Sequence, residues 1–116
     1  MPTDDSAPID KDSIAALTTA MHAFVASKGW YEPDSKRPQT PRNLAVSLSL
    51  EASEILELWQ WGDEMPDQQA LASELADVLL YLMQLASVSE VDLGQAVLDK
   101  LQINATREWD VEPDES

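Results

Sequence analysis

Two consecutive segments of this chain combine helical apolar periodicity with a pair of carboxylates three residues apart. The pairs are Glu51 with Glu54 and Glu74 with Asp77. Residues three apart in a helix point the same way, so each pair shares one helix face. On the helical wheel, each pair lies within about 80° of leucine, isoleucine and valine side chains that should face the core. Both pairs are therefore predicted at the edge of a buried stripe.

Carboxylates in that position need a positive partner. Unpaired buried charges are costly, and four facing acids repel one another, which raises at least one pKa. The chain has only 7 Lys and Arg against 22 Asp and Glu. Hard divalent cations such as Mg²⁺ and Mn²⁺ prefer carboxylate oxygens. The pattern thus predicts a metal site on Glu51, Glu54, Glu74 and Asp77 that binds Mg²⁺ or Mn²⁺; the alternative is that these acids are solvated on helix surfaces.

The remaining periodicity predicts an all-α fold, a four-helix bundle with antiparallel neighbours. Capping residues and apolar spacing place helices at about 13–28, 40–61, 67–88 and 92–109. Asp92 with Gln95 forms a capping-box pattern at the start of the last helix. We expect a disordered arm over 1–11, one domain over 12–109 and an acidic tail over 110–116.

Composition excludes several classes of partner. A net charge of −15 disfavours nucleic-acid polymers and anionic membrane surfaces. No uninterrupted apolar run reaches the length of a membrane span, and the N-terminus lacks the basic residues of a signal peptide. Cysteine is absent, which excludes disulfides and thiolate sites. We expect a soluble, cytoplasmic protein.

Cationic and aromatic side chains supply a second set of candidates. Lys100, Asn104 and Arg107 share one face of the last predicted helix and suit phosphate oxygens, although salt bridges to neighbouring acids would explain them too. The loop at 30–39 concentrates Trp30, Tyr31, Lys36 and Arg37. Trp30, Tyr31 and Trp61 offer aromatic surface for a base. Carboxylate di-iron bundles use Glu-x-x-His pairs, which this chain lacks, so hydrolysis with a hard metal is favoured over redox chemistry.

The ordered set of motifs resembles the MazG-like all-α nucleoside triphosphate pyrophosphohydrolases, especially the short dCTP-pyrophosphatase-like members. That family carries ExxE, a spacer and then ExxD; here 19 residues separate Glu54 from Glu74. Further matches are Thr40-Pro41-Arg42-Asn43-Leu44, Trp59-Gln60-Trp61, Asp77-Val78-Leu79-Leu80-Tyr81-Leu82 and Lys100-Leu101-x-x-Asn104-x-x-Arg107. The resemblance covers about residues 13 to 109.

The resemblance implies Mg²⁺-dependent hydrolysis of a nucleoside triphosphate to the monophosphate and pyrophosphate. It implies that the four acids are metal ligands and catalytic, that Lys100, Asn104 and Arg107 contact phosphates, and that Trp61 and Tyr81 shape the nucleotide pocket, where Trp30 is a further candidate. It also implies a homodimer or homotetramer with sites at subunit contacts.

The chain departs from the family at two places. Pro38-Gln39 stand where members often have Phe-His, and Ser53 replaces a glycine inside the first acid motif. The first change falls where base contacts are expected, so base preference cannot be carried over from the family. The expected function is clearance of surplus or non-standard deoxynucleotides. The alternatives are a non-catalytic nucleotide- and metal-binding regulatory bundle and a plain interaction bundle.

Overall fold

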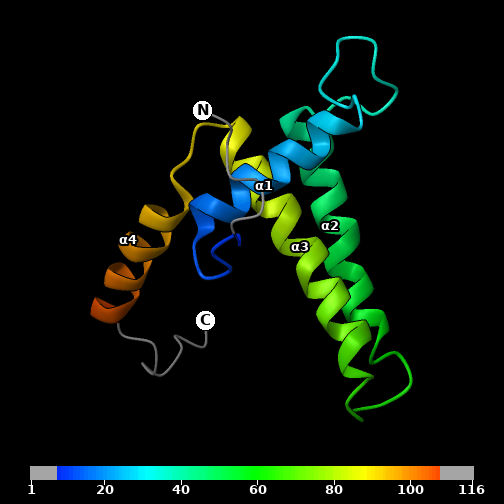
Figure 1. Cartoon of the computed structure of the whole chain (residues 1–116). Coiled ribbons are helices and arrows are strands. Elements are labelled where there is room, and N and C mark those ends of the chain that lie inside the picture. Colours follow the sequence, from blue (N-terminus) through cyan, green and yellow to red (C-terminus); the bar gives the residue numbers. More distant parts are fainter. Residues whose placement is uncertain (1–7, 108–116) are drawn as a thin grey trace, which may run out of the picture.

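The computed structural model describes residues 8–107, and Figure 1 shows four helices in this part of the chain. The helices are α1 (Ile14–Ser27), α2 (Pro41–Glu57), α3 (Gln68–Val88) and α4 (Leu93–Thr106). No strand occurs among the described residues, which confirms the all-α prediction. Residues 1–7 of the expected N-terminal arm, and the expected tail over 110–116, lie outside the described residues.

Every helix begins at a residue whose side-chain oxygen accepts a hydrogen bond from the backbone three residues later. This bond satisfies one of the amide groups that a helix leaves free at its N-terminus. The capping residues are Ser13, Thr40, Asp67 and Asp92. At the other end of α1, Gly29 has a φ of 75°, a left-handed conformation that glycine adopts without steric cost. These sequence signals placed all four helix starts correctly.

Two helix ends were predicted too late. α2 ends at Glu57 rather than Trp61, because the amides of Leu58, Trp59 and Gln60 bond to carbonyls only three residues back. Such tighter turns close a helix and turn its axis. α4 ends at Thr106, short of the predicted residue 109.

The expected capping box on α4 is only half formed. Asp92 accepts from the Gln95 amide at 3.0 Å, but the Gln95 side chain donates forward to Asp99 at 2.9 Å. The reciprocal half of the box would have needed Gln95 to reach back to the amide of Asp92.

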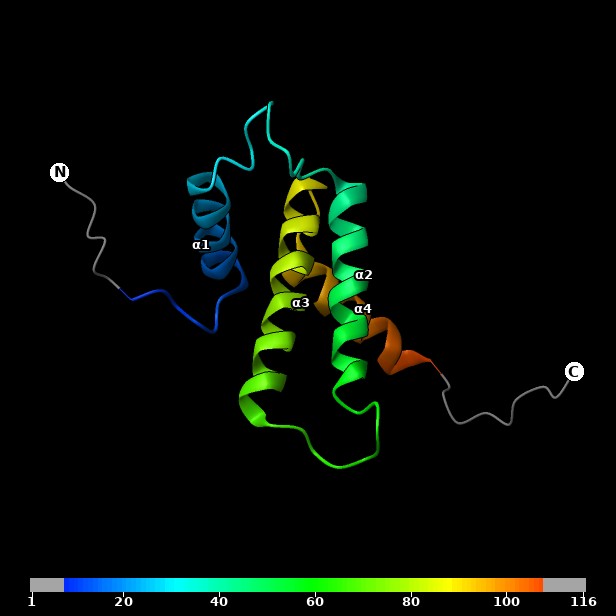
Figure 2. The same cartoon turned by 90° about the vertical axis from the view of Figure 1, so that its right-hand side faces the viewer.

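α3 is the central helix of the fold. It lies antiparallel to α2 along most of its length, and α1 packs against its C-terminal half (Figure 2). Buried apolar side chains in the described chain come from these three helices: Met21, Val25, Leu44 and Met83. α4 contacts α3 only weakly and diverges from the α2–α3 pair (Figure 1). A single chain therefore does not close the four helices into a compact bundle.

The described chain leaves many apolar side chains exposed. α4 buries none of its residues, and Val97, Leu98, Leu101 and Ile103 are all exposed. α3 exposes Leu75, Leu80 and Leu82, and by length and composition alone it could cross a membrane. It nevertheless carries Glu74 and Asp77 and packs between α1 and α2.

Candidate functional site

The antiparallel pairing of α2 and α3 brings three of the four predicted acids together. Glu51 and Glu54 come from α2 and Glu74 from α3, and one carboxylate oxygen of each lies within 4.8 Å of the others. Asp77 does not belong to this close group, but it lies one turn further along α3. Its charge acts on Glu51 and Glu74, so it borders the cluster. We call Glu51, Glu54 and Glu74 the acid cluster.

Two buried carboxylate oxygens of the acid cluster lack a hydrogen-bond partner within residues 8–107. The Oε2 atoms of Glu51 and Glu74 are buried and have no hydrogen-bond partner among the described residues. Buried polar atoms are normally paired, so two such oxygens in one cluster indicate a ligand. Converging carboxylate oxygens suit Mg²⁺ or Mn²⁺. The residues present therefore fit the divalent cation that the sequence predicts.

The electrostatics of the cluster agree with this geometry. Burial raises the pKa of Glu51 to about 7, with further increases from hydrogen bonding to Glu54 and from the charges of Glu54, Asp77 and Glu74. Hydrogen bonding to Glu54 and burial raise the pKa of Glu74, and the charges of Glu54 and Asp77 raise it further. Every charged group that acts on these two carboxyls is itself an acid. The cluster is thus held under mutual repulsion that a divalent cation would relieve.

This repulsion predicts that the metal-free protein loses stability as the pH rises. The folded-state pKa of Glu51 lies above its unfolded value, so between about pH 4.5 and 7 the folded state binds more protons. The free energy of unfolding therefore falls across this window. Thermal unfolding in a chelator should give Glu51→Gln and wild type the same Tm near pH 4.5. At pH 8 the Tm of Glu51→Gln should be higher by several degrees. A constant difference at all pH values would contradict the assignment.

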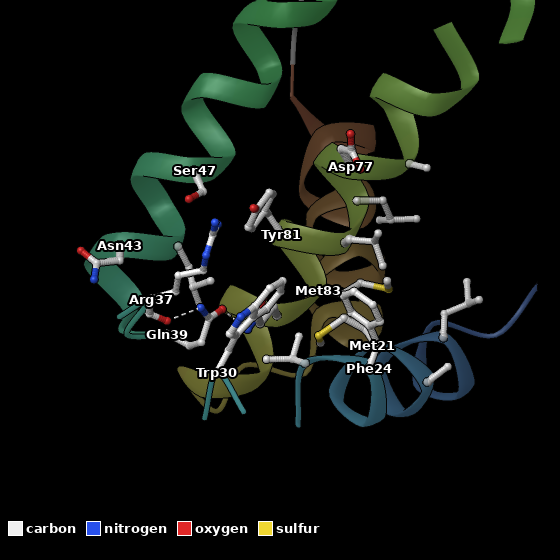
Figure 3. Close-up of a pocket in the computed structure, with 18 of the residues that line it drawn as sticks. Met21, Phe24, Trp30, Arg37, Gln39, Asn43, Ser47, Asp77, Tyr81 and Met83 are labelled. Atoms are coloured by element: carbon white, nitrogen blue, oxygen red, sulfur yellow. Dashed lines mark hydrogen bonds between the residues drawn. The ribbon is translucent and has the colours of Figure 1, made fainter. Parts of the chain in front are cut away.

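A cavity of about 840 Å³ lies between α1, α2 and α3, and Asp77 lines it, whereas the three residues of the acid cluster do not. Figure 3 shows Asp77 at one end, Trp30 and Gln39 at the other, and Tyr81 between them. Its side facing α1 is apolar, with Met21, Phe24 and Met83. A cavity with a carboxylate at one end and an apolar side wall suits an amphipathic ligand such as a nucleotide.

The loop between α1 and α2 forms the wall farthest from the acids. Trp30 packs edge-on against Phe24, with ring centroids 5.8 Å apart. The Arg37 guanidinium lies over the Trp30 ring, 5.5 Å from its centroid, and the side chain extends into the cavity (Figure 3). A cation on an aromatic face is stabilised by the ring quadrupole. The loop thus places a flat surface and a positive charge inside the cavity.

The structure brings some predicted site residues together and leaves others apart. Trp30, Asp77 and Tyr81 line the cavity. Trp61 follows the end of α2 and is 92% exposed, outside the cavity. Lys100 and Asn104 lie on α4, away from the cavity of the same chain, and Arg107 lies beyond the helix with an extended backbone. The early end of α4 removes Arg107 from the helical face on which its spacing had placed it.

Sequence reasoning did not assign site roles to several residues of the cavity. Arg37 was noticed only as one of few cations in an acidic chain, and Gln39 only as a departure from a family pattern. Gln84 was not singled out. It follows Asp77 by seven residues and Tyr81 by three, a helical spacing that places all three on one face of α3. That spacing was the available signal.

Comparisons with known proteins agree with the fold. A family model described as the MazG nucleotide pyrophosphohydrolase domain matches residues 39–107. The chain is 41% identical to dCTP pyrophosphatase 1 of Bos taurus and 40% identical to that of Homo sapiens, each over 97 residues. These alignments cover 75% of this chain and 54% of the relative, so the chain spans about half the length of these proteins.

A solved structure shows the same arrangement of helices. A pyrophosphatase from Archaeoglobus fulgidus superposes with a TM-score of 0.67 at 33% identity, covering 78% of this chain and 87% of the other. The family model covers more than half of the chain, including the acid cluster, Asp77 and the start of α2. The chain therefore belongs to the MazG nucleotide pyrophosphohydrolase family.

Proposed function

We propose that this protein hydrolyses deoxynucleoside triphosphates to the monophosphate and pyrophosphate, with Mg²⁺ or Mn²⁺ held by the acid cluster. The observation that carries the proposal is the pair of buried, unpartnered oxygens on Glu51 and Glu74 beside a nucleotide-sized cavity. Family membership and the relatives named dCTP pyrophosphatase support it.

Each part of the site has a distinct task in this proposal. Glu51, Glu54 and Glu74 hold the cation, which when bound would neutralise phosphate oxygens and act as a Lewis acid. Asp77 faces both cluster and cavity, where its carboxylate is placed to accept a proton from the attacking water. Water attacks the α-phosphorus, the bond to the bridging oxygen breaks, and pyrophosphate leaves. Tyr81 and Trp30 line the space for sugar and base.

A second copy of the chain completes this site in the proposal. The phosphate-binding candidates Lys100 and Asn104 lie on a helix that does not reach the cavity of its own chain. The same helix exposes the apolar side chains Val97 and Leu101. Packing this helix on a neighbouring chain would bury apolar surface and bring its cations to the neighbour's acids. A homodimer or homotetramer is therefore proposed, acting in the cytoplasm to clear surplus nucleotides.

The experiment is hydrolysis of dCTP, dUTP, dTTP, dATP and dGTP with Mg²⁺ in water enriched in ¹⁸O. Pyrophosphate should be released, with the heavy oxygen in the monophosphate, because attack falls on the α-phosphorus. Heavy oxygen in the pyrophosphate would place the attack elsewhere and contradict the mechanism. Tight Mg²⁺-dependent nucleotide binding without any product would favour the non-catalytic regulatory alternative.

A further inference from the structure

A hydrogen-bond network closes the end of the cavity that lies opposite the acids. Gln84 is only 3% exposed, and its Nε2 donates to Gln39 Oε1 at 2.7 Å and to the Tyr31 hydroxyl at 3.2 Å. Gln39 Nε2 in turn donates to the backbone carbonyl of Arg37 at 2.5 Å. Gln84, Gln39 and the Arg37 side chain all line the cavity. A polar network is thus built into an otherwise largely apolar wall.

The direction of every bond in this network is fixed by one backbone carbonyl. The Arg37 carbonyl can only accept, so Gln39 must turn its amide nitrogen toward it and its oxygen toward Gln84. Gln84 must then present nitrogen to Gln39, and its two N–H groups are both used. Its Oε1 receives no hydrogen bond from residues 8–107. The network therefore offers the cavity an acceptor rather than a donor.

The network is also anchored on the side away from the cavity. The Tyr31 hydroxyl accepts from Gln84 and lies 2.5 Å from His22 Nδ1, while His22 Nε2 lies 2.7 Å from Ser87 Oγ. Burial raises the pKa of Tyr31, although the bond from Gln84 acts in the opposite direction, so the hydroxyl keeps its proton for His22. These bonds tie the loop to α1 and α3. The Gln84 amide is therefore preorganised and does not readily rotate to exchange its oxygen and nitrogen.

Helix geometry places the Gln84 acceptor about as far from Asp77 as the base of a nucleotide lies from its α-phosphate. Asp77 and Gln84 are seven residues apart on one face of α3, which corresponds to about 10 Å along the helix axis. Tyr81 lies between them, and Trp30 and Gln39 lie at the far end (Figure 3). This separation is on the scale of the distance from an α-phosphate to the pairing edge of its base. A nucleotide with its phosphate at the acids therefore directs that edge toward Gln84.

We propose that Gln84 is a specificity-determining residue whose Oε1 accepts a hydrogen bond from an exocyclic amino group of the base. This assignment rests on the proposed function. The favoured substrates are nucleotides of amino-bearing bases, cytosine or adenine, over their keto counterparts uracil and hypoxanthine. A carbonyl at the same place would face the Gln84 oxygen, which would leave two acceptors unpaired. Gln39 and Tyr31 are positioning residues that keep the Gln84 amide in one orientation.

The test compares dCTP with dUTP, which differ at this position by an amino group and a carbonyl. Wild type should show a kcat/KM for dCTP at least about tenfold above that for dUTP. Gln84→Met keeps the length of the side chain but removes the acceptor, so it should raise KM for dCTP and bring the ratio near one. Gln69→Met is the matched control, because Gln69 is exposed at the start of α3 and lies outside the cavity.

A second variant tests the fixed orientation without altering Gln84. Gln39→Met removes the group that holds the Gln84 amide, so Gln84 can turn and present N–H to a carbonyl. The kcat/KM for dUTP should then rise about three- to tenfold relative to that for dCTP. If Gln39 had a merely structural role, its substitution would lower kcat/KM for both substrates in proportion, and that result would overturn the assignment.

Binding of the product monophosphates gives a readout that does not need turnover. Calorimetry in saturating Mg²⁺ should show that wild type binds dCMP more tightly than dUMP, and that Gln84→Met binds the two with equal affinity. Equal affinities in wild type would refute the role of Gln84, even if pyrophosphate is released as proposed. A preference for dCMP in a protein that hydrolyses no triphosphate would refute the proposed function alone.

Discussion

Replacing Glu51 by Gln should lower the hydrolysis of deoxynucleoside triphosphates by at least about 100-fold, because the substitution removes a carboxylate from the acid cluster. Glu74→Gln should have a similar effect, since Glu74 also contributes a buried oxygen that lacks a partner. The loss should appear mainly in kcat at saturating Mg²⁺. Steady-state rates of pyrophosphate release across a series of Mg²⁺ concentrations measure it directly.

Thermal unfolding separates loss of the metal site from loss of the fold. Mg²⁺ at 100 times its Kd should raise the free energy of unfolding of the wild type by about 2.7 kcal/mol. Glu51→Gln should lose this stabilisation but remain folded. Glu57→Gln is the matched control, because Glu57 lies on the same helix, is exposed and does not belong to the acid cluster. Full activity and full Mg²⁺ stabilisation in Glu51→Gln would mean that the acids are solvated.

Mixing two inactive variants should restore activity if the site is shared between subunits. Glu51→Gln disables the acids of one chain, and Lys100→Ala disables the phosphate contact contributed by α4 to its neighbour. In a mixed dimer, one site then carries both substitutions and the other carries neither. Random pairing should restore roughly a quarter of the wild-type sites. Rates of pyrophosphate release by co-expressed, purified mixtures measure the recovery.

The control for this experiment mixes two variants whose substitutions both lie in the acid cluster. Glu51→Gln mixed with Glu74→Gln should stay inactive, because both acids of one cluster come from the same chain and every cluster is damaged. Recovery in the control would indicate that the acids come from different chains. No recovery in the first mixture, despite mixed oligomers seen by native mass spectrometry, would place Lys100 outside the neighbour's site.

Local signals in the sequence were sufficient for the helices and the acid cluster. Each helix start depends on one capping side chain, and the acids depend on spacing within a helix, so both can be predicted without tertiary contacts. The antiparallel pairing that joins Glu51 to Glu74 followed from the short connection between their helices. Local patterns therefore predicted the convergence of Glu51, Glu54 and Glu74 in the candidate site.

The half of the site that we propose binds the base depends on contacts that no local pattern contains. Gln84 meets Gln39 across 45 positions of the chain and Tyr31 across 53. His22 contributes through its bond to Ser87 on α3, which lies 65 positions further along the chain. The placement of α4 depends on what covers its apolar face, which spacing within the helix cannot specify.

The loop from Trp30 to Gln39 lines the cavity but contributes no carboxylate to the acid cluster. Part of the cavity wall is thus encoded apart from the acids, whereas Gln84 shares α3 with Glu74 and Asp77. Substitutions in this loop can alter which nucleotide is accepted while the hydrolytic chemistry is retained. Exchanging the loop together with residue 84 between homologues should therefore transfer substrate choice, while the acid cluster is left unchanged.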